Sequence, residues 1–501
     1  MIRESSQNLI LKKLGINTYK EAVIYINANS NICISEGFEV QARVKVKLNK
    51  KSIIATLNKI DSNLLEKNEA GLSNYAWDLL EAKKGDKITI SHAKPLTSLS
   101  FVRSKIYGNK LSEAELDEII KDITLGYYCD IHISSFLTTC SGNRMEKDEI
   151  INLTKAMIKV GNHLDWDNKI IVDKHCVGGL PGNCTTPIIV SIIAEFGLTM
   201  PKTSSRAITS PAGTADVMEV LAPVEIDIKT MKNVISKENG CIIWGGSACL
   251  SPADDILIRV ERVLDLDSEG QLVASILSKK IAAGSNHILI DIPIGPTAKV
   301  RSQEMAETLK DYLQSVGESL NIVVKAVFSD GTQPVGCGIG PALEARDVVS
   351  VLKCDKNAPQ DLRQRALILA GEIIEFSPNI KKGEGIIIAT DILDKGKAWK
   401  KFQAICEAQG GMKEIGKSQY THNYKSKKDG IISEINNRQI SLLAKLTGAP
   451  LDKTSGIELY VKIGQSIKKG DNLFTIHTSS QSEIEYVLDY LGDNDEIIKY
   501  D

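Results

Sequence analysis

The segment from Asp173 to Ala215 constrains this chain more than any other. Two loops rich in glycine and hydroxyl side chains, DKHCVGGLPGNCTTP and PKTSSRAITSPAGTA, flank the apolar run IIVSIIAEFG. The first loop follows the apolar residues Ile170 to Val172, as a loop after a strand does, and the run itself is typical of a buried helix. Small residues between a strand and a helix leave backbone N–H groups open to an anion, and the helix N-terminus adds partial positive charge. The pattern predicts a phosphate-binding site, although two tight turns in an α/β protein would explain the same glycines.

Composition limits the class of protein and its partners. The chain has 501 residues, of which 43% are hydrophobic and 25% charged, so we expect about three globular domains. A formal net charge of -2 gives no reason to expect nucleic-acid or membrane partners. The ten cysteines are scattered without a CxxC pair, which favours reduced thiols over a disulfide framework. No signal peptide and no apolar run of about 18 residues is present, and we expect a soluble, cytoplasmic protein.

The order of the apolar patterns predicts an α/β multidomain protein. Alternating segments such as AVIYIN and VQARVKVKL predict short strands in the first part of the chain. Ser112 and Glu115 fit a helix capping box, and Glu146 to Val160 has an amphipathic helical pattern. Further on, KIIVD, HILIDIPIG, VVKAVFSD and EGIIIAT are strand-like runs that alternate with helical patterns. The predicted domains are a β-rich domain at 1–90, a helical domain at 91–165, an α/β domain at 166–415 and a small α/β domain at 425–501.

Five motifs occur together and in order: DKHxxGG, SRAITSPAGTAD, SPADD, ASILSKK and GCGIGPALEARDV. With them the chain resembles the thymidine phosphorylase family of nucleoside phosphorylases, and most of all its type 2 branch, which includes archaeal AMP phosphorylases. The resemblance implies a nucleoside phosphorylase/phosphoribosyltransferase-like fold, with a helical domain beside an α/β domain that has a central sheet. It also implies an N-terminal module involved in assembly, and a homodimer or larger homo-oligomer.

The resemblance assigns roles to particular residues. Phosphate would be bound by a lysine and by hydroxyl groups of the two loops, namely Lys174, Thr185, Thr186, Ser205 and Thr214. The nucleoside or nucleotide would contact Gly179, Arg206, Ala207, Ile208, Thr209, Ser210, Arg259, Ser275, Lys279 and Lys299. Asp267 would donate a proton to the leaving base, and His175 would face the sugar or the base carbonyl.

Three of these assignments have physical support or an alternative in the residues themselves. Ser275 and Lys279 are four residues apart in a helical pattern and therefore share a face. Asp267 lies in LDLDSEG, which also fits an exposed acidic turn, and an acid at pH 7 would need a pKa raised by burial or by a nearby anion. His132, in YYCDIHISSF, could border the substrate cleft, but a structural role is the plainer interpretation.

Cys176 departs from the family pattern, in which many members have serine after the histidine. A thiol is a poor hydrogen-bond donor, so one contact to phosphate would be weakened or would come from a backbone N–H. Cys176 would otherwise serve as a small space-filling residue. If its thiol faces the phosphate site, we expect its oxidation or alkylation to inhibit.

The leading functional hypothesis is a pentosyltransferase that carries out phosphorolysis. Phosphate would attack the sugar carbon while the base leaves from the opposite face, so the enzyme needs neither a carboxylate nucleophile nor a cofactor or metal. Thymidine is the first candidate substrate and AMP the alternative. A phosphoribosyltransferase that uses an activated ribose pyrophosphate, and an inactive assembly protein, are further alternatives.

Overall fold

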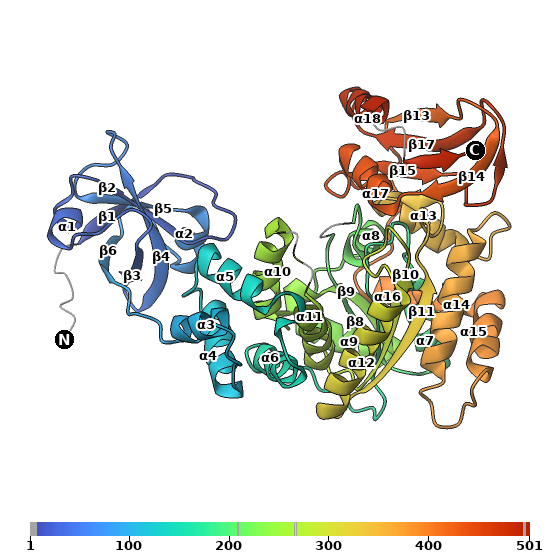
Figure 1. The fold of residues 1–501 in the computed structure, drawn as a ribbon, viewed down its shortest axis with the longest axis horizontal. Helices are drawn as coiled ribbons and strands as arrows, with labels where there is room; N and C mark the ends of the chain where they lie inside the picture. The colour runs from blue at the N-terminus through green and yellow to red at the C-terminus, as the bar shows by residue number, and fades with distance from the viewer. Residues whose placement is uncertain (1–7, 208–209, 265, 267, 494–496) are drawn as a thin grey trace. The chain divides into compact units, whose positions relative to one another are not determined.

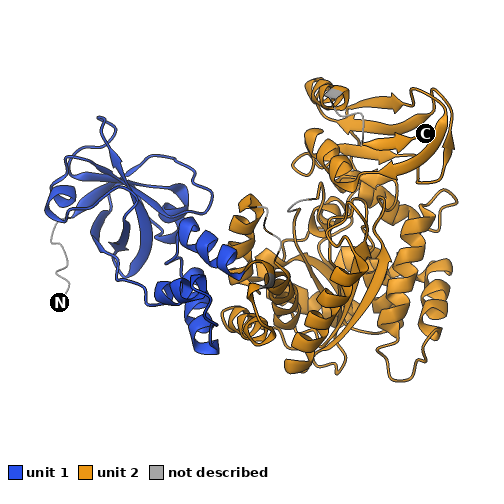
Figure 2. Ribbon diagram, viewed as in Figure 1, with its two compact units in different colours: residues 1–140 blue, residues 141–501 orange. Residues whose placement is uncertain are grey.

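The structure is a computed structural model that describes residues 8–207, 210–264, 266, 268–493 and 497–501. The chain forms two compact units, residues 1–140 and residues 141–501 (Figure 2). Within the described residues, no helix is long and apolar enough to span a membrane.

A closed β-barrel forms most of the first unit (Figure 1). Its strand order is β1-β5-β2-β4-β3-β6, with the bounds β1 (Leu9–Lys13), β2 (Val23–Asn27), β3 (Arg43–Leu48), β4 (Lys51–Ile60), β5 (Glu69–Leu72) and β6 (Lys87–His92). Two short helices, α1 (Asn31–Ser35) and α2 (Asn74–Leu79), complete it. In β3 the buried residues Val44 and Val46 alternate with the exposed Lys45 and Lys47, because successive side chains of a strand point to opposite faces. This alternation predicted the β-rich first part.

Three helices follow the barrel within the same unit: α3 (Ser98–Ile106), α4 (Glu113–Thr124) and α5 (Asp130–Cys140). The capping box predicted at Ser112 is present, since its side chain accepts from the backbone N–H of Glu115 and the Glu115 carboxylate accepts from the backbone N–H of Ser112. Arg43 of the barrel donates to the Gly126 carbonyl oxygen between α4 and α5, at 2.8 Å.

Parallel strands form the centre of the second unit. Strands β7 (Val172–Cys176), β10 (His287–Ile294) and β11 (Val323–Asp330) form a sheet of order β11-β10-β7, and β8 (Met200–Ser204) pairs with β9 (Gly240–Trp244). A parallel bridge between Ile171 and Thr199 links the two sheets. The carboxyl ends of parallel strands meet at one edge, which is where α/β proteins bind ligands. The fold is therefore the mixed α/β class expected.

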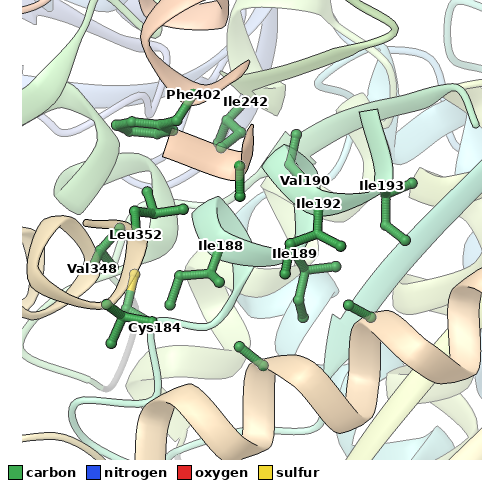
Figure 3. Close-up of a cluster of buried hydrophobic side chains, with 14 of the residues drawn as sticks. Cys184, Ile188, Ile189, Val190, Ile192, Ile193, Ile242, Val348, Leu352 and Phe402 are labelled. Atoms are coloured by element: carbon green, nitrogen blue, oxygen red, sulfur yellow. The ribbon is translucent and has the colours of Figure 1, made fainter. Parts of the chain in front are cut away.

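Helices cover this sheet on both faces (Figure 1). Their bounds are α6 (Lys147–Lys159), α7 (Thr186–Phe196), α8 (Thr214–Leu221), α9 (Ile228–Glu238), α10 (Pro252–Leu264), α11 (Glu269–Ala282), α12 (Gln303–Ser319), α13 (Pro341–Leu352), α14 (Gln360–Ile374), α15 (Glu384–Asp394) and α16 (Lys397–Ala408). Helix α7 is the buried helix predicted between the two loops: Ile188, Ile189, Ile192 and Ile193 lie in the main hydrophobic core, where Phe402 of α16 packs beside them (Figure 3). The core thus holds the N-terminus of α7 in a fixed position.

One predicted strand is wrong. EGIIIAT forms helix α15, which packs against α14 and buries Ala389, Ile392 and Leu393. A short run of β-branched residues does not distinguish a buried strand from a buried helix by its period. The decisive contact is tertiary, because a Cβ on Gly385 would lie 2.1 Å from the carbonyl oxygen of Gly371.

The last part of the chain forms two small sheets with two helices. Strands β12 (Gly338–Ile339), β15 (Gly456–Leu459), β17 (Asn472–Thr478) and β13 (Tyr420–Lys425) form one sheet, and β14 (Gly430–Ile435) pairs with β16 (Ser466–Ile467) and β18 (Ile498–Tyr500). The helices are α17 (Asn437–Leu446) and α18 (Gln481–Asp493). Strand β12 comes from the GCGIG motif before α13, so this sheet includes a strand from the α/β region.

The close approach of α14 and α15 gives a test of the packing. We predict that Gly385→Ala lowers the free energy of unfolding by about 2–4 kcal/mol, because the added methyl group has no space against the Gly371 carbonyl. Gly492→Ala is the matched control, since no atom lies within 4 Å of the position its added methyl group would take and alanine favours the helix. Urea denaturation measures both, and equal stability of the two variants would contradict the packing.

Candidate functional site

A fully buried carboxylate lies at the centre of the candidate site. Asp173 of β7 is 0% exposed, and its two oxygens contact Lys202 Nζ of β8 at 3.2 Å and Lys280 Nζ of α11 at 2.8 Å. The backbone N–H of Lys174 donates to the same carboxylate at 2.6 Å. A buried charge is stable only when it is paired and hydrogen-bonded. Asp173 therefore connects two strands and a helix within the protein interior.

The side chain of Lys174, from β7, reaches the N-terminus of α7, as the first loop predicted. Its Nζ donates to Thr185 Oγ1 at 2.9 Å, and the residue is only 2% exposed. Thr185 is the N-cap residue of α7 and Thr186 begins the helix, so the ammonium group and the Thr185 hydroxyl lie at the helix N-terminus. This combination suits a bound anion, because the helix end and the ammonium group are both positive.

The second loop contributes a serine that the sequence motifs did not single out. Ser204 is buried, and its Oγ has no hydrogen-bond partner among the described residues. It follows Lys202 by two positions in β8, so both side chains point to the face that carries Asp173. Ser205, predicted to bind phosphate, is exposed. Its role in binding phosphate stays a prediction, and Ser204 is a second candidate hydroxyl beside it.

Helix α8 begins at Thr214, and the loop before it is tightly packed. Asp216 accepts from the backbone N–H groups of Ala207 and Gly213 at 2.7 and 3.0 Å. A Cβ on Gly213 would lie 2.6 Å from the Ser205 carbonyl oxygen, so only glycine fits there. These contacts fix the backbone at Ala207 and Gly213, on either side of Ser210 and just before Thr214. The predicted contacts Ile208 and Thr209 lie outside the described residues.

The Arg206 side chain is occupied by other protein groups. Its guanidinium contacts Glu219 at 2.8 Å, Glu225 at 2.6 Å and Asp216 at 3.3 Å, and it lies over the Trp244 ring at 5.0 Å. The hydrogen bond from Arg206 lowers the pKa of the Glu219 carboxyl to about 2. A nucleotide contact from this residue would therefore come from its backbone rather than from a free cation.

Ser275 and Lys279 share a face of α11, as their spacing predicted. Lys279 Nζ donates to Ser275 Oγ at 3.1 Å and to Asp254 Oδ2 of α10 at 2.7 Å. Asp254 comes from the SPADD motif and is 2% exposed. Arg259 lies further along α10, and Lys299 lies in the loop after β10; both have interactions within the chain. Asp267 lies outside the described residues, so its proposed acid role stays a prediction.

The pKa of His175 is lowered by its burial and by the charges of the lysines around it. Burial lowers its pKa well below the usual value, and the positive charges of Lys280, Lys279, Lys202 and Lys174 act in the same direction. The imidazole is therefore neutral at pH 7. The four lysines come from β7, β8 and α11, and two carboxylates, Asp173 and Asp254, pair with three of them. The fourth lysine, Lys174, contacts the Thr185 hydroxyl instead.

Cys176 is less reactive than the sequence suggested. Its Sγ accepts from Asn183 Nδ2 at 3.3 Å, and the parallel register places it opposite Asp291 of β10. Burial and the Asp291 carboxylate raise the pKa of the Cys176 thiol far above its usual value. Because the thiolate is the reactive form, the structure argues against inhibition through alkylation of Cys176 near neutral pH.

The described residues include no group of three or more His, Cys, Asp or Glu side chains placed to hold a metal ion. The expectation that neither a metal nor a cofactor is needed stays a prediction.

The chain is similar to known proteins over almost its whole length. Family models match a glycosyl transferase family helical bundle domain at residues 99–161, an a/b domain of the same family at 168–399, and a pyrimidine nucleoside phosphorylase C-terminal domain at 431–497. A "Putative thymidine phosphorylase" from Legionella pneumophila (strain Corby) is 57% identical over 498 residues, which cover 99% of this chain and 96% of that protein. A protein of the same name from Hahella chejuensis is 52% identical over 97% of this chain and 96% of its own length.

This chain belongs to the thymidine and pyrimidine nucleoside phosphorylase family. It is therefore a pentosyltransferase. Among solved structures it is similar to the anthranilate phosphoribosyltransferase of Thermus thermophilus, with a TM-score of 0.51 and 18% identity over 62% of this chain and 98% of that one. The Saccharomyces cerevisiae enzyme of the same name, in complex with PRPP and Mg, gives a TM-score of 0.50 at 16% identity, over 63% of this chain and 98% of that one. At these identities the likeness shows the fold alone.

Five further residues lie among the motif residues, and the sequence analysis gave none of them a role in the site. They are Asp173, Lys202, Ser204, Asp254 and Lys280. Two signals in the sequence could have found some of them. A lysine inside the buried strand MPKTS needs an anionic partner, and the second lysine of ASILSKK follows directly after the predicted one.

The pairing of Asp173 with two lysines predicts a large effect on stability. Asp173→Asn keeps the shape but leaves Lys202 and Lys280 without a counter-charge, so we expect a loss of about 3–5 kcal/mol in the free energy of unfolding.

The matched control is Asp254→Asn, because Asp254 is as buried but pairs with one lysine that also contacts Ser275 and is partly exposed. We expect it to cost about 1–2 kcal/mol. Urea denaturation of both variants measures the difference, and a smaller loss for Asp173→Asn than for Asp254→Asn would contradict the central role of Asp173.

Proposed function

We propose that this enzyme catalyses the reversible phosphorolysis of thymidine to thymine and 2-deoxy-α-D-ribose 1-phosphate. The observation that carries the proposal is the buried group formed by Lys174, Thr185 and the N-terminus of α7, beside the lysines around His175. The names of the relatives and the match to a pyrimidine nucleoside phosphorylase domain support the pyrimidine substrate.

The chemistry requires an anion site and donors for the leaving base. Phosphate, held by Lys174 and the loop hydroxyls, forms a bond from one of its oxygens to C1′ as the bond from C1′ to N1 of thymine breaks. The electron pair of that bond passes to the base and spreads onto its carbonyl oxygens, so donors such as Lys279 and Ser275 lower the barrier if they contact those oxygens. The neutral His175 can also donate to a carbonyl oxygen. The base finally takes up a proton, for which Asp267 is the proposed donor.

The Arg206 contacts favour thymidine over AMP. AMP carries a 5′-phosphate that needs additional cations, and Arg206 of the SRAITS motif already contacts three carboxylates. A guanidinium shared among Asp216, Glu219 and Glu225 offers little charge to a further anion. We also expect the enzyme to act as a homodimer or larger homo-oligomer.

A substrate panel tests the proposal. Purified enzyme is incubated with inorganic phosphate and, separately, with thymidine, uridine, adenosine or AMP, and the released base and sugar phosphate are measured by chromatography. We expect thymine release that depends on phosphate. Release of adenine from AMP without cleavage of thymidine would contradict the thymidine assignment, and a requirement for an activated ribose pyrophosphate would contradict phosphorolysis.

The phosphate site has its own prediction. Lys174→Met keeps the apolar part of the side chain and removes the charge, so we expect the KM for phosphate to rise about ten- to a hundredfold, which corresponds to about 1.5–3 kcal/mol for a hydrogen bond to a charged group. The exposed Lys232→Met on α9 is the control. Steady-state kinetics at varied phosphate measures both, and an unchanged KM in Lys174→Met would place the phosphate elsewhere.

A further inference from the structure

The first unit contains a second group of chemically active side chains, centred on Cys129 and His132. Cys129 directly precedes helix α5, and its carbonyl oxygen accepts the first hydrogen bond of that helix, from the N–H of Ile133. Its Sγ lies 3.5 Å from His132 Nδ1, and its backbone N–H donates to the same ring nitrogen at 3.4 Å. The Nδ1 lone pair therefore faces the thiol, which is the arrangement of a thiol and its base.

The surroundings of Cys129 stabilise its thiolate. Burial by itself raises the pKa of the Cys129 thiol, but the hydrogen bonds and the charge of His132 outweigh burial, and the pKa lies below the usual value. The Arg43 guanidinium interacts electrostatically with Cys129, and the positive end of α5 acts in the same direction. Glu21 and Asp130 are acidic residues that interact with Arg43, and their negative charges oppose this effect.

The other cysteines provide a comparison. Burial raises the pKa of the Cys176, Cys337 and Cys406 thiols, and it also raises that of Cys354, where Asp394 adds to the effect. Cys354 is nevertheless exposed, whereas Cys129 is half-buried. If exposure determines reactivity, Cys354 should react first; if thiolate stability determines it, Cys129 should react first. The two effects can therefore be separated by experiment.

A cavity of about 930 Å³ lies beside His132, and it is lined by residues of the barrel and of the segment that follows it. Tyr127 and His132, which flank Cys129 in the sequence, both line it. The volume is in the range of sites for small molecules.

The wall of the cavity is positively charged. Arg43, Lys45 and Lys47 alternate along β3, so all three point away from the barrel interior and toward the cavity. Lys94 and His92 add to the lining, and the lining residues, all within the described part of the chain, include no Asp or Glu. Such a wall attracts small anions and concentrates them beside His132, the hydrogen-bond partner of the thiol.

We propose that Cys129 is a modification site at which a small anionic disulfide, such as glutathione disulfide, forms a mixed disulfide with the protein. The Cys129 thiolate attacks one sulfur of the disulfide, a new bond forms between Sγ and that sulfur, and the original S–S bond breaks. Its electron pair leaves on the other sulfur as a thiolate, and His132 holds the proton that Cys129 gave up until solvent takes it. The incoming disulfide is the only oxidant, so the exchange is balanced.

The test uses the full-length reduced enzyme and three disulfides that differ in charge. Glutathione disulfide is anionic, hydroxyethyl disulfide is neutral and cystamine is cationic. Intact mass and peptide mapping follow each adduct over time. We expect the first glutathione adduct on Cys129, about tenfold faster than on the exposed Cys354, with Cys176 unmodified. At Cys129 the rate should fall from the anionic to the cationic disulfide by about tenfold at low ionic strength, and the difference should shrink in high salt.

Three variants assign the effect to its causes. Cys129→Ser removes the fast adduct. His132→Gln slows the reaction of Cys129 and moves the midpoint of its rate against pH upward, because the base is lost. The double variant Lys45→Gln and Lys47→Gln keeps the reaction with the neutral disulfide but loses the preference for the anion. Thermal unfolding checks that each variant is folded.

Several outcomes would overturn the proposal. A first adduct on Cys354 or Cys249 would show that exposure alone determines reactivity. Equal rates for the three disulfides at Cys129 would remove the role of the cationic wall, and a pH profile unchanged in folded His132→Gln would remove the role of the base.

Discussion

The pairing of Asp173 with Lys202 and Lys280 is the interaction on which the functional half of this enzyme depends. Asp173 is the first residue of the DKH motif, yet its side chain points into the protein and joins β7 to β8 and α11. Both lysines also donate to the Thr203 carbonyl oxygen, at 2.7 and 3.4 Å, so the same cluster positions the start of the second loop. A buried carboxylate tolerates little displacement, because every unpaired charge in this environment is costly.

The positively charged lysines around Asp173 are buried. Lys174 is 2% exposed and Lys280 3%, and their ammonium groups are held by Thr185 and Asp173. Burial and, after it, the positive charges of the lysines lower the pKa of His175 and keep it neutral, so the site combines cations for an anion with an uncharged donor for a base. Arg206 is the cation that stands out in the sequence of the second loop, but it pairs with Glu219 and Glu225 and lies over the Trp244 ring. These contacts stabilise the loop.

Sequence patterns predicted some features of the fold and site well, and others poorly, for identifiable reasons. The buried helix α7, the Ser112 capping box and the shared face of Ser275 and Lys279 depend on local periodicity, and all three are present. Helix α15 was mistaken for a strand because IIIAT suits both, and its packing on Gly371 decides the matter. Ser204 was passed over in favour of Ser205 because only the pleat of β8 distinguishes the buried hydroxyl from the exposed one.

The sequence by itself determined the family, the two loops and the residue types of the anion site, since motifs, glycine positions and helical spacing are local properties of the chain. Only the tertiary structure decided which of these groups act together. The charge on His175 and the pKa of the Cys176 thiol depend on burial and on neighbours far away in the sequence, such as Lys280 and Asp291. Electrostatic energies are set by distance in space and by burial, and the linear chain specifies neither until it folds.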